Sequence, residues 1–159
     1  MENHYNLLYR EDEKDLIPFC KKTDVSLMPY SPLAAGHLTR PTWATDTLRS
    51  ATDKVSRGKY DRAEDNDLAI IARVQNVAER HNVPMARVAI AWQCAKGIAS
   101  PIIGATKTRH LDDAVAALDL ELTPEEISSM EEPYLPHETV GPIDSNPPQG
   151  VVLLDAEKN

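Results

Sequence analysis

Residues 101–122 constrain the fold more than any other stretch of this chain. They open with an apolar run at 101–103 whose length suits a buried parallel strand, and Gly104 then breaks the strand. A short loop with Lys107 and Arg109 follows, and apolar residues then recur on one helix face, at Leu111, Val115 and Leu118. A strand, a glycine, a basic loop and a helix start together offer backbone N–H groups and a positive dipole to an anion. The pattern favours a phosphate site, and the alternative is an αβ connection with solvated basic residues.

Composition and charge narrow the class of protein. The chain has 159 residues, of which 42% are hydrophobic and 26% charged, as in an ordinary globular protein of one domain. A formal net charge of -8 argues against nucleic acid or an anionic membrane as partner. Cys20 and Cys94 lack metal or redox spacing, which fits a reducing compartment. Without a leader-like segment or a membrane-length apolar run, we expect a cytoplasmic protein.

Strands and helices are expected to alternate along the chain, which indicates an α/β fold with a parallel sheet. We expect strands near residues 4–8, 25–29 and 98–103, and helices near 11–22, 65–80, 85–96, 109–118 and 124–132. Residues 65–67 are expected to cap the helix over 65–80, and Asn82 can end it in the left-handed conformation. Residues 123–126 predict a capping box with Pro124 in the first helical position. Residues 39–65 read as a long loop with a short helix near 46–55. The expected division is a body at 1–132 and an extended proline-rich tail at 133–159.

Four motifs, taken in order, resemble the C-terminal part of an aldo-keto reductase. They are NHYNLLYREDEKDLIPFC, MPYSPLAAGHL, SPIIGATKTRHLDDAVAALDLELTPEEI and MEEPYLPH. The similarity covers roughly residues 3–138 and is greatest to the members called aryl-alcohol dehydrogenase-like. It implies a (β/α)₈ TIM barrel that reduces aldehydes or ketones with NADPH. A whole barrel needs about 250 residues, so the resemblance implies a partial barrel that holds only strands six to eight with their helices.

The resemblance also implies which residues contact the cofactor. Tyr30 resembles the aromatic residue that stacks on the nicotinamide ring, and its alternative is a core residue with its hydroxyl at the rim. The loop over the pyrophosphate would comprise Ser31, Pro32, Leu33, Gly36 and Leu38. The pocket for the 2′-phosphate would comprise Gly104, Ala105, Thr106 and Lys107. The charge of Lys107 favours NADPH over NADH, and His110 and Asp113 fall where relatives hold the adenine end.

Several features depart from the family's pattern. Glu2 stands where relatives usually have a glutamine that bonds the nicotinamide carboxamide, and a carboxylate cannot donate to a carbonyl. Asp113 and Ala114 stand where many relatives have Glu-Asn. The family's catalytic Asp, Tyr, Lys and His lie on the first four strands, so we assign no catalytic residue here. The tyrosines left without that role are Tyr5, Tyr9, Tyr60 and Tyr134. The histidines lack metal spacing, and no metal site is expected.

Two interpretations follow from these observations. In the first, the chain is the C-terminal, cofactor-binding part of an NADPH-dependent reductase from a truncated or split gene. Its expected partners are a small carbonyl substrate in the full-length form and an N-terminal half-barrel or another copy. In the second, the chain is a non-catalytic remnant, or a half-barrel that serves as an interaction or nucleotide-binding module. Both interpretations predict that the chain alone is inactive, because neither supplies the proton donor that carbonyl reduction needs.

Overall fold

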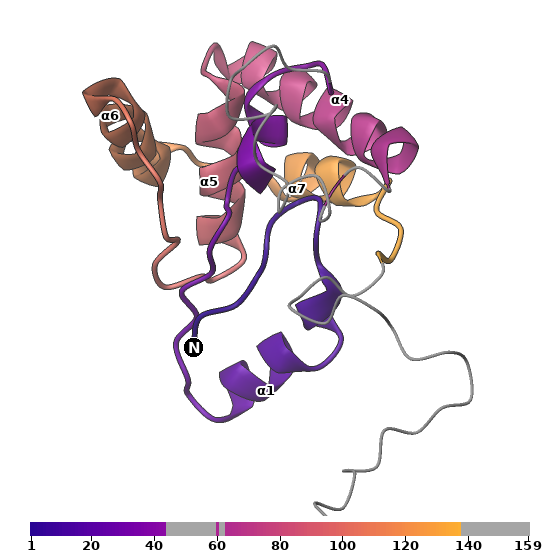
Figure 1. Cartoon of the computed structure of the whole chain (residues 1–159), viewed down its shortest axis with the longest axis vertical. Helices are drawn as coiled ribbons and strands as arrows, with labels where there is room; N and C mark the ends of the chain where they lie inside the picture. The colour runs from indigo at the N-terminus through magenta and orange to yellow at the C-terminus, as the bar shows by residue number, and fades with distance from the viewer. Residues whose placement is uncertain (44–59, 61–62, 138–159) are drawn as a thin grey trace, which may run out of the picture.

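The computed structural model describes residues 1–43, 60 and 63–137, and in these residues helices predominate (Figure 1). In chain order the helices are η1 (Glu11–Glu13), α1 (Leu16–Lys22), η2 (Ala34–Thr39), α4 (Glu64–His81), α5 (Met85–Ala95), α6 (Thr108–Ala116), η3 (Ala117–Asp119) and α7 (Pro124–Glu131). The helix expected near 46–55 and the tail beyond residue 137 lie outside the described residues. No described helix is long and apolar enough to cross a membrane.

Helices α4 and α5 form the centre of the hydrophobic core. The fully buried side chains of α4 include Ile70, Ile71, Val74 and Val77, and those of α5 include Val88 and Trp92. As expected, Asn82 ends α4 in the left-handed conformation with φ 52°, and its N–H donates to the Ala78 and Glu79 carbonyls. Pro84 then precedes α5, so the two helices are joined by a short turn and pack against each other.

The start of α4 differs from the expectation that residues 65–67 cap it. The helix begins at Glu64 after Ala63, which offers no side-chain cap. Asp65 and Asp67 therefore lie inside the first turn, where their negative charge still favours the positive end of the helix dipole. Acidic side chains favour any position in the first turn of a helix. The acidic cluster therefore predicted where α4 begins only to within one turn, and not the exact first residue.

Local signals place α7 correctly. The Thr123 side chain accepts from the Glu126 N–H, and the Glu126 side chain accepts from the Thr123 N–H. This reciprocal capping box was expected from the sequence, with Pro124 in the first helical position. The two bonds satisfy backbone donors that the first helical turn cannot pair by itself.

The helix expected over residues 11–22 is divided in two. Its first part is the short 3-10 turn η1, and α1 begins only at Leu16, whose N–H donates to the Asp15 side chain. Pro18 lies in the first turn of α1, where a missing N–H removes no intrahelical bond. Asp15 thus caps a separate helix, and because this helix begins at Leu16, Pro18 lies in its first turn, where proline is tolerated.

The strands that the sequence predicts are reduced to single bridges between three parallel segments. His4 bridges to Tyr30, and Tyr30 bridges to Ile102. The Tyr30 N–H donates to the Asn3 carbonyl at 2.9 Å, and the Ile102 N–H donates to the Pro29 carbonyl at 2.9 Å. Because successive N–H groups of an extended chain point to opposite sides, position 29 faces the third segment, where proline has nothing to donate. The predicted regular strands are therefore wrong, and the partial barrel is not confirmed, although the segments do run in parallel.

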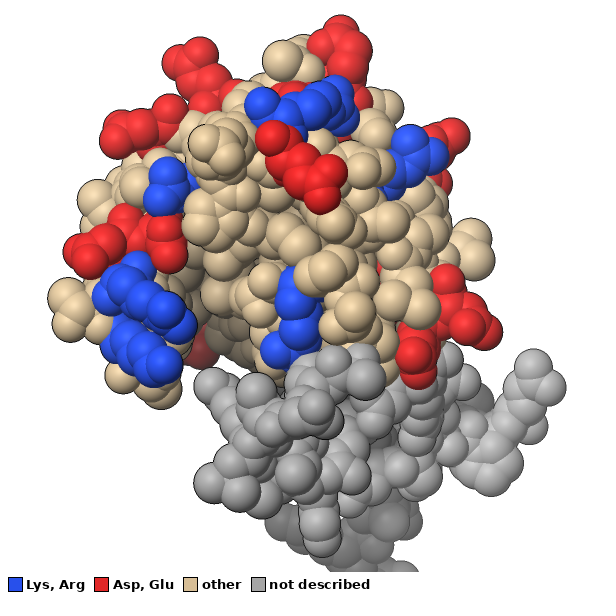
Figure 2. Space-filling model, turned by 90° about the horizontal axis from the view of Figure 1, so that it is seen from above, with Lys and Arg blue, Asp and Glu red and all other residues tan. Residues whose placement is uncertain are grey.

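Charges of both signs are mixed on the surface. On the face shown in Figure 2, acidic and basic side chains are interspersed and no field of a single sign forms. The net charge of -8 is thus spread over many separate side chains. An anion site on this face would therefore rest on a few local cations and backbone groups.

The segment after α7 is attached to the rest of the fold through its side chains. Tyr134 Oη donates to Glu11 at 2.7 Å, and the His137 N–H donates to the same carboxylate at 2.8 Å. His137 Nε2 lies 2.9 Å from Asp67 Oδ1 in a buried pair. Burial lowers the pKa of His137, but Asp67 and Glu11 together outweigh burial and raise this pKa above its ordinary value. The boundary between body and tail at residue 132 stays a prediction, and these contacts hold the first residues beyond it.

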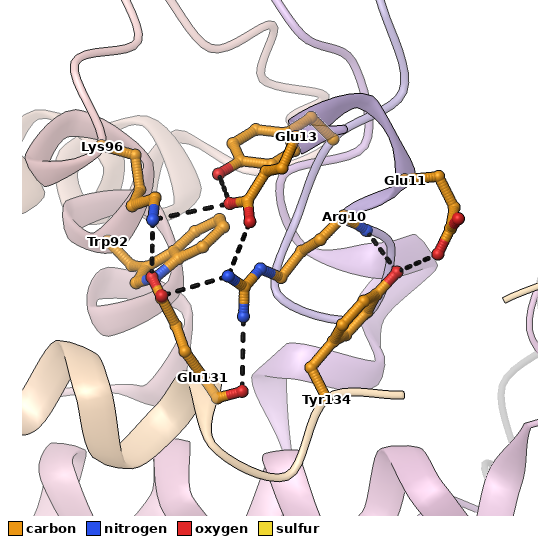
Figure 3. A network of polar contacts seen from close by, with 8 residues as sticks. Arg10, Glu11, Glu13, Trp92, Lys96, Glu131 and Tyr134 are labelled. Carbon is orange, nitrogen blue, oxygen red and sulfur yellow. Dashed lines mark hydrogen bonds and ion pairs between the residues drawn. The ribbon is translucent and has the colours of Figure 1, made fainter. Parts of the chain in front are cut away.

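A network of charged side chains joins the N-terminal segment to α5 and α7 (Figure 3). Arg10 Nη2 donates to Glu13 at 2.7 Å and to Glu131 at 3.1 Å. Lys96 Nζ lies 3.0 Å from Glu131, and the Trp92 indole N–H donates to Glu131 at 2.8 Å. Burial alone would raise the pKa of Glu13, but the hydrogen bonds and charges around it hold this pKa below its ordinary value. Glu131 is therefore the common acceptor that ties α7 to two other parts of the fold.

Removing this acceptor is expected to destabilise the fold. Glu131→Ala would leave the Trp92 indole N–H unpaired and would leave Arg10 and Lys96 with Glu13 alone as carboxylate partner. We therefore expect it to lower the free energy of unfolding by roughly 2–4 kcal/mol. Glu132→Ala is the matched control, because the Glu132 side chain is 71% exposed against 18% for Glu131. An exposed pair such as Glu132–Arg73 is worth about 0–1 kcal/mol. Urea denaturation measures both variants, and equal losses would contradict a stabilising role for the network.

The pair of His137 and Asp67 predicts how stability changes with pH. A histidine pKa that rises on folding adds stability that is complete below the unfolded value of about 6.5 and is lost as pH rises through the folded pKa. We expect the free energy of unfolding to fall above about pH 6.5, and this fall to shrink in His137→Gln. His110→Gln is the control, because His110 has no ion pair among the described residues. Denaturation across this pH range tests the prediction, and identical profiles for the two variants would contradict it.

Candidate functional site

The two segments that the sequence assigns to phosphate binding meet at one cavity. Residues 30–36 form one wall and residues 102–110 the other, around a volume of about 410 Å³. The predicted site residues in its lining are Tyr30, Ser31, Pro32, Leu33, Gly36, Gly104, Thr106 and His110, and the lining is completed by Ala35, Ile102 and Ile103. The parallel bridges explain the meeting, because loops that leave neighbouring parallel segments emerge at the same edge. The volume lies within the range of roughly 300–1,000 Å³ that is typical of ligand sites.

The loop on the first wall has an unusual backbone. Left-handed φ values occur at Ser31 (59°), Ala34 (47°), Ala35 (54°) and Gly36 (101°). For a residue other than glycine, this conformation costs on the order of 1–3 kcal/mol and persists only where the surroundings enforce it. Here Ala34 and Leu38 are fully buried and anchor the loop in the core. Clusters of such residues are found at binding sites, so the backbone makes this loop a candidate for ligand binding independently of its sequence.

The second wall leads into the N-terminus of α6. Lys107 precedes the helix in an extended conformation and provides no side-chain cap, so no side chain of the N-cap residue accepts from the first N–H groups. Lys107 and Arg109 are exposed, and no described carboxylate pairs with either. A helix start with unpaired donors and two cations favours an anion at this end of the cavity.

Tyr30 is held in a stack of rings at the bottom of the first wall. Its ring lies parallel to that of His4, with centroids 5.1 Å apart and an interplanar angle of 6°. His4 stacks in turn on Tyr9 at 4.3 Å, and His4 Nε2 lies 2.8 Å from Tyr60 Oη. Tyr30 also lines the cavity. The stack therefore fixes the orientation of the one tyrosine ring in the described lining of the cavity.

Four predicted site residues do not line the cavity. Leu38 is fully buried in the core, which fits an anchor of the loop better than a contact residue. Ala105 and Lys107 are exposed beside the lining residues. Asp113 pairs with Arg87 at 2.8 Å and so links α6 to α5. The assignment of all four to a cofactor stays a prediction.

Arg40 lies next to this site, and the sequence did not identify it. Its terminal nitrogens lie 3.6 and 3.8 Å from the position that a Cβ on Gly36 would occupy, so the guanidinium packs beside Gly36, although Arg40 does not line the cavity. Its Nε is buried without a hydrogen-bond partner, and burial lowers the pKa of the side chain. No described carboxylate pairs with it. The only sequence signal was a basic residue close to Gly36, and no pattern showed that this side chain folds back onto the loop.

Three tyrosines that the sequence left without a catalytic role are engaged elsewhere. Burial raises the pKa of Tyr5, whose hydroxyl donates to Glu13. Burial also raises the pKa of Tyr60 and that of Tyr134. These surroundings favour the neutral phenol, which is opposite to the lowered pKa of a proton donor poised for catalysis. In the described part of the chain, no group of three His, Cys, Asp or Glu side chains is placed to hold a metal ion.

Comparison with known proteins assigns the family. The family model described as "Aldo/keto reductase family" matches residues 1–134. The chain belongs to the aldo/keto reductase family. The resemblance of the four sequence motifs is thereby confirmed, because the match spans all of them except the last residues of MEEPYLPH.

Several members of the aldo/keto reductase family are similar over most of this chain. Versiconal hemiacetal acetate reductase of Aspergillus parasiticus is 44% identical over 137 residues, which are 86% of this chain and 40% of that protein. A Schizosaccharomyces pombe protein, named as an aryl-alcohol dehydrogenase, is 46% identical over 90% of this chain and 40% of its own length. The thermostable aldo-keto reductase Tm1743, solved with the inhibitor epalrestat, matches with a TM-score of 0.56 and 25% identity over 84% of this chain and 39% of that one. The chain thus spans about 40% of the length of the curated relatives it matches.

Substitution of the two glycines that line the cavity tests how the backbone conformation of its walls affects stability. At Gly36 φ is 101°, and an added Cβ would meet Arg40, whereas at Gly104 it would meet nothing within 4 Å. We expect Gly36→Ala to lower the free energy of unfolding by about 1–2 kcal/mol, and Gly104→Ala to change it by less than about 0.5 kcal/mol. Urea denaturation measures both. A loss at Gly104→Ala as large as at Gly36→Ala would contradict the argument from φ.

Proposed function

We propose that the cavity between residues 30–36 and 102–110 binds the phosphates of NADP(H), and that the chain is the cofactor-binding part of a reductase that converts aldehydes or ketones to alcohols. The observation that carries the proposal is the meeting of both predicted phosphate segments at this cavity. Membership of the aldo/keto reductase family and relatives named as reductases support the oxidoreductase class.

The residues around the cavity fit a ligand with several phosphates. Gly36 leaves the loop backbone accessible, and the guanidinium of Arg40 packs on it without a hydrogen-bond acceptor for Nε. A partly buried cation without an acceptor is unfavourable, and an anion at the loop would remove this cost. Lys107 and the start of α6 provide a second positive region at the other wall. We assign the pyrophosphate to the loop with Arg40, and the 2′-phosphate to Lys107.

Tyr30 has the position and the support to orient a planar ring. Because His4 stacks on it and Tyr60 lies within hydrogen-bond distance of His4, the ring of Tyr30 is fixed before any ligand arrives. In this proposal the bound NADPH supplies the hydride for carbonyl reduction. The role of Tyr30 is to restrict which face of the nicotinamide is exposed, since a restrained ring reacts more often from a productive geometry.

The proton donor for the reaction is assigned to another part of the enzyme. Carbonyl reduction needs an acid beside the developing alkoxide, and the buried tyrosines of this chain are held as neutral phenols by other contacts. We place the acid in the part of the family's length that this chain does not cover. The alternative, a non-catalytic nucleotide-binding remnant, predicts the same cofactor binding, and the two differ in whether adding the uncovered part restores turnover.

Titration with NADPH, followed by nicotinamide fluorescence, tests the cofactor assignment. We expect saturable binding by the folded chain. Lys107→Ala should weaken NADPH binding about tenfold, corresponding to the loss of one charge-assisted contact, and should affect NADH binding much less. Arg40→Ala should weaken both cofactors alike, because both contain the pyrophosphate. The different responses of the two variants would separate the two phosphate subsites.

Lys22→Ala is the control for the loss of a positive charge, because Lys22 is exposed in the last turn of α1 and does not line the cavity. It should leave both affinities unchanged at the same ionic strength. Circular dichroism confirms that each variant is folded. The absence of saturable binding by a folded native chain, or equal weakening by Lys22→Ala and Lys107→Ala, would overturn the assignment.

A further inference from the structure

Asn6 lies behind the first wall of the cavity, and every hydrogen-bonding group of its side chain is paired. The residue is fully buried and is not part of the cavity lining. Its Oδ1 accepts from the Leu8 N–H at 2.9 Å and from the Tyr9 N–H at 3.0 Å. Its Nδ2 donates to the Ser31 carbonyl at 2.9 Å and to Tyr60 Oη at 3.0 Å. A side-chain amide has two donors and two acceptor sites, so these contacts use all of them and fix the orientation of the amide.

The bond to Ser31 joins the loop on the first wall to another chain segment. Ser31 lines the cavity and has a left-handed φ of 59°. Its carbonyl also accepts from the Ala34 N–H at 3.0 Å, so two donors set the direction of this carbonyl at the start of the loop. Among the described residues, no side chain outside residues 31–39 donates to any other carbonyl of residues 31–36. Asn6 therefore stabilises a backbone conformation that a serine rarely adopts alone.

The bond to Tyr60 extends the effect of Asn6 to the ring of Tyr30. Tyr60 is buried, and its hydroxyl lies 2.8 Å from His4 Nε2. The His4 ring lies parallel to the Tyr30 ring, which lines the cavity. Tyr30 and Ser31 are consecutive, so Asn6 supports one through stacked rings and the other through its carbonyl. The parts of the wall that the proposed function assigns to the nicotinamide and to the pyrophosphate therefore share one buried support.

We infer that Asn6 is a positioning residue of this site, and that its side-chain amide holds the loop of residues 31–36 in the conformation that receives the pyrophosphate. The inference deepens the proposed function and rests on it for the identity of the ligand. Asn6 does not line the cavity, so it acts through the Ser31 carbonyl and not by contact with a ligand. A loop that is ordered before binding loses little conformational entropy when a ligand binds, so loss of the Asn6 donor should weaken binding. If Asn6 only closes the turn of residues 6–9, removal of the donor alone would leave the loop unchanged.

Two substitutions separate the donor of Asn6 from its acceptor. Asn6→Asp keeps an oxygen for the N–H groups of the turn but places a carboxylate against the Ser31 carbonyl. Asn6→Ser is uncharged and can still close the turn, but its side chain is one bond shorter and does not reach Ser31. Asn3→Asp is the matched control, because Asn3 is buried in the same segment and its side chain donates to Asp12 at 2.8 Å, away from the loop. This control brings two carboxylates together, so it should lower the stability of the fold without affecting the loop.

Hydrogen exchange of the ligand-free chain, followed by NMR, measures the order of the loop directly. The exchange rate of the Ala34 N–H, divided by that of the Val74 N–H in α4, should rise at least about tenfold in both Asn6 variants. In Asn3→Asp a loss of global stability speeds exchange at Val74 as well, so this ratio should not rise. If Asn6→Asp does not fold, Asn6→Ser alone decides the outcome, since it buries no charge. A ratio that does not rise in the folded Asn6 variants would overturn the inference, whether or not NADPH binds.

Binding experiments then connect the loop to the cofactor. Asn6→Ser should weaken NADPH binding about tenfold and should change the affinity for adenosine 2′-monophosphate by less than about twofold, because this fragment lacks the pyrophosphate and the nicotinamide. Asn3→Asp should leave both affinities of the folded chain unchanged. Equal effects of Asn6→Ser on the two ligands, or no effect on either, would overturn the inference. A folded native chain that does not bind NADPH would instead overturn the proposed function, and the exchange ratio would still show whether Asn6 positions the loop.

Discussion

The parallel contact of three chain segments at His4, Tyr30 and Ile102 is the constraint on which the candidate site depends. Tyr30 is the middle member and the first residue of the cavity wall, so one position both pairs the segments and begins the loop. Because the segments are parallel, the chain leaves all of them at the same edge. Helix α5 stabilises this register, since the Gln93 side-chain amide donates to the Tyr5 carbonyl in the buried core. A shift of one segment by a residue would turn its side chains to the other face and separate the two walls.

How much of the fold the sequence predicts depends on the range of the interactions involved. The capping box of Thr123 and the left-handed Asn82 act within one turn, and helix ends set by such signals were predicted correctly. The division at Asp15 was missed, because an acidic run is compatible with either a 3-10 turn or a helix start. The regular strands were predicted wrongly, because a strand exists only through its neighbours. Pro29 removes a donor on one side, and the outer edges have no partner among the described residues.

The segments of the candidate site were selected from motifs, whereas the regular sheet expected beside them was predicted wrongly. The loop beginning at Ser31 and the basic turn before α6 were assigned from motifs, and the cavity brings both together. Leu38 belongs to the same motif, but its side chain is fully buried in the core. A sequence motif shows that the residue type at a position matters, and it does not show whether the residue contacts a ligand or packs in the core. Arg40 shows the opposite error: it packs beside Gly36 because the chain folds back, and no linear pattern contains this contact.

The left-handed residues of the η2 loop affect how a ligand would associate. Ser31, Ala34 and Ala35 adopt a conformation that an isolated peptide rarely visits, and the buried neighbours that impose it are part of the folded core. The loop therefore reaches its shape during folding and has little conformational entropy left to lose when a molecule docks. A ligand should therefore bind to a loop that already has its bound conformation. The free energy needed to order the loop then lowers the stability of the fold and does not weaken ligand binding.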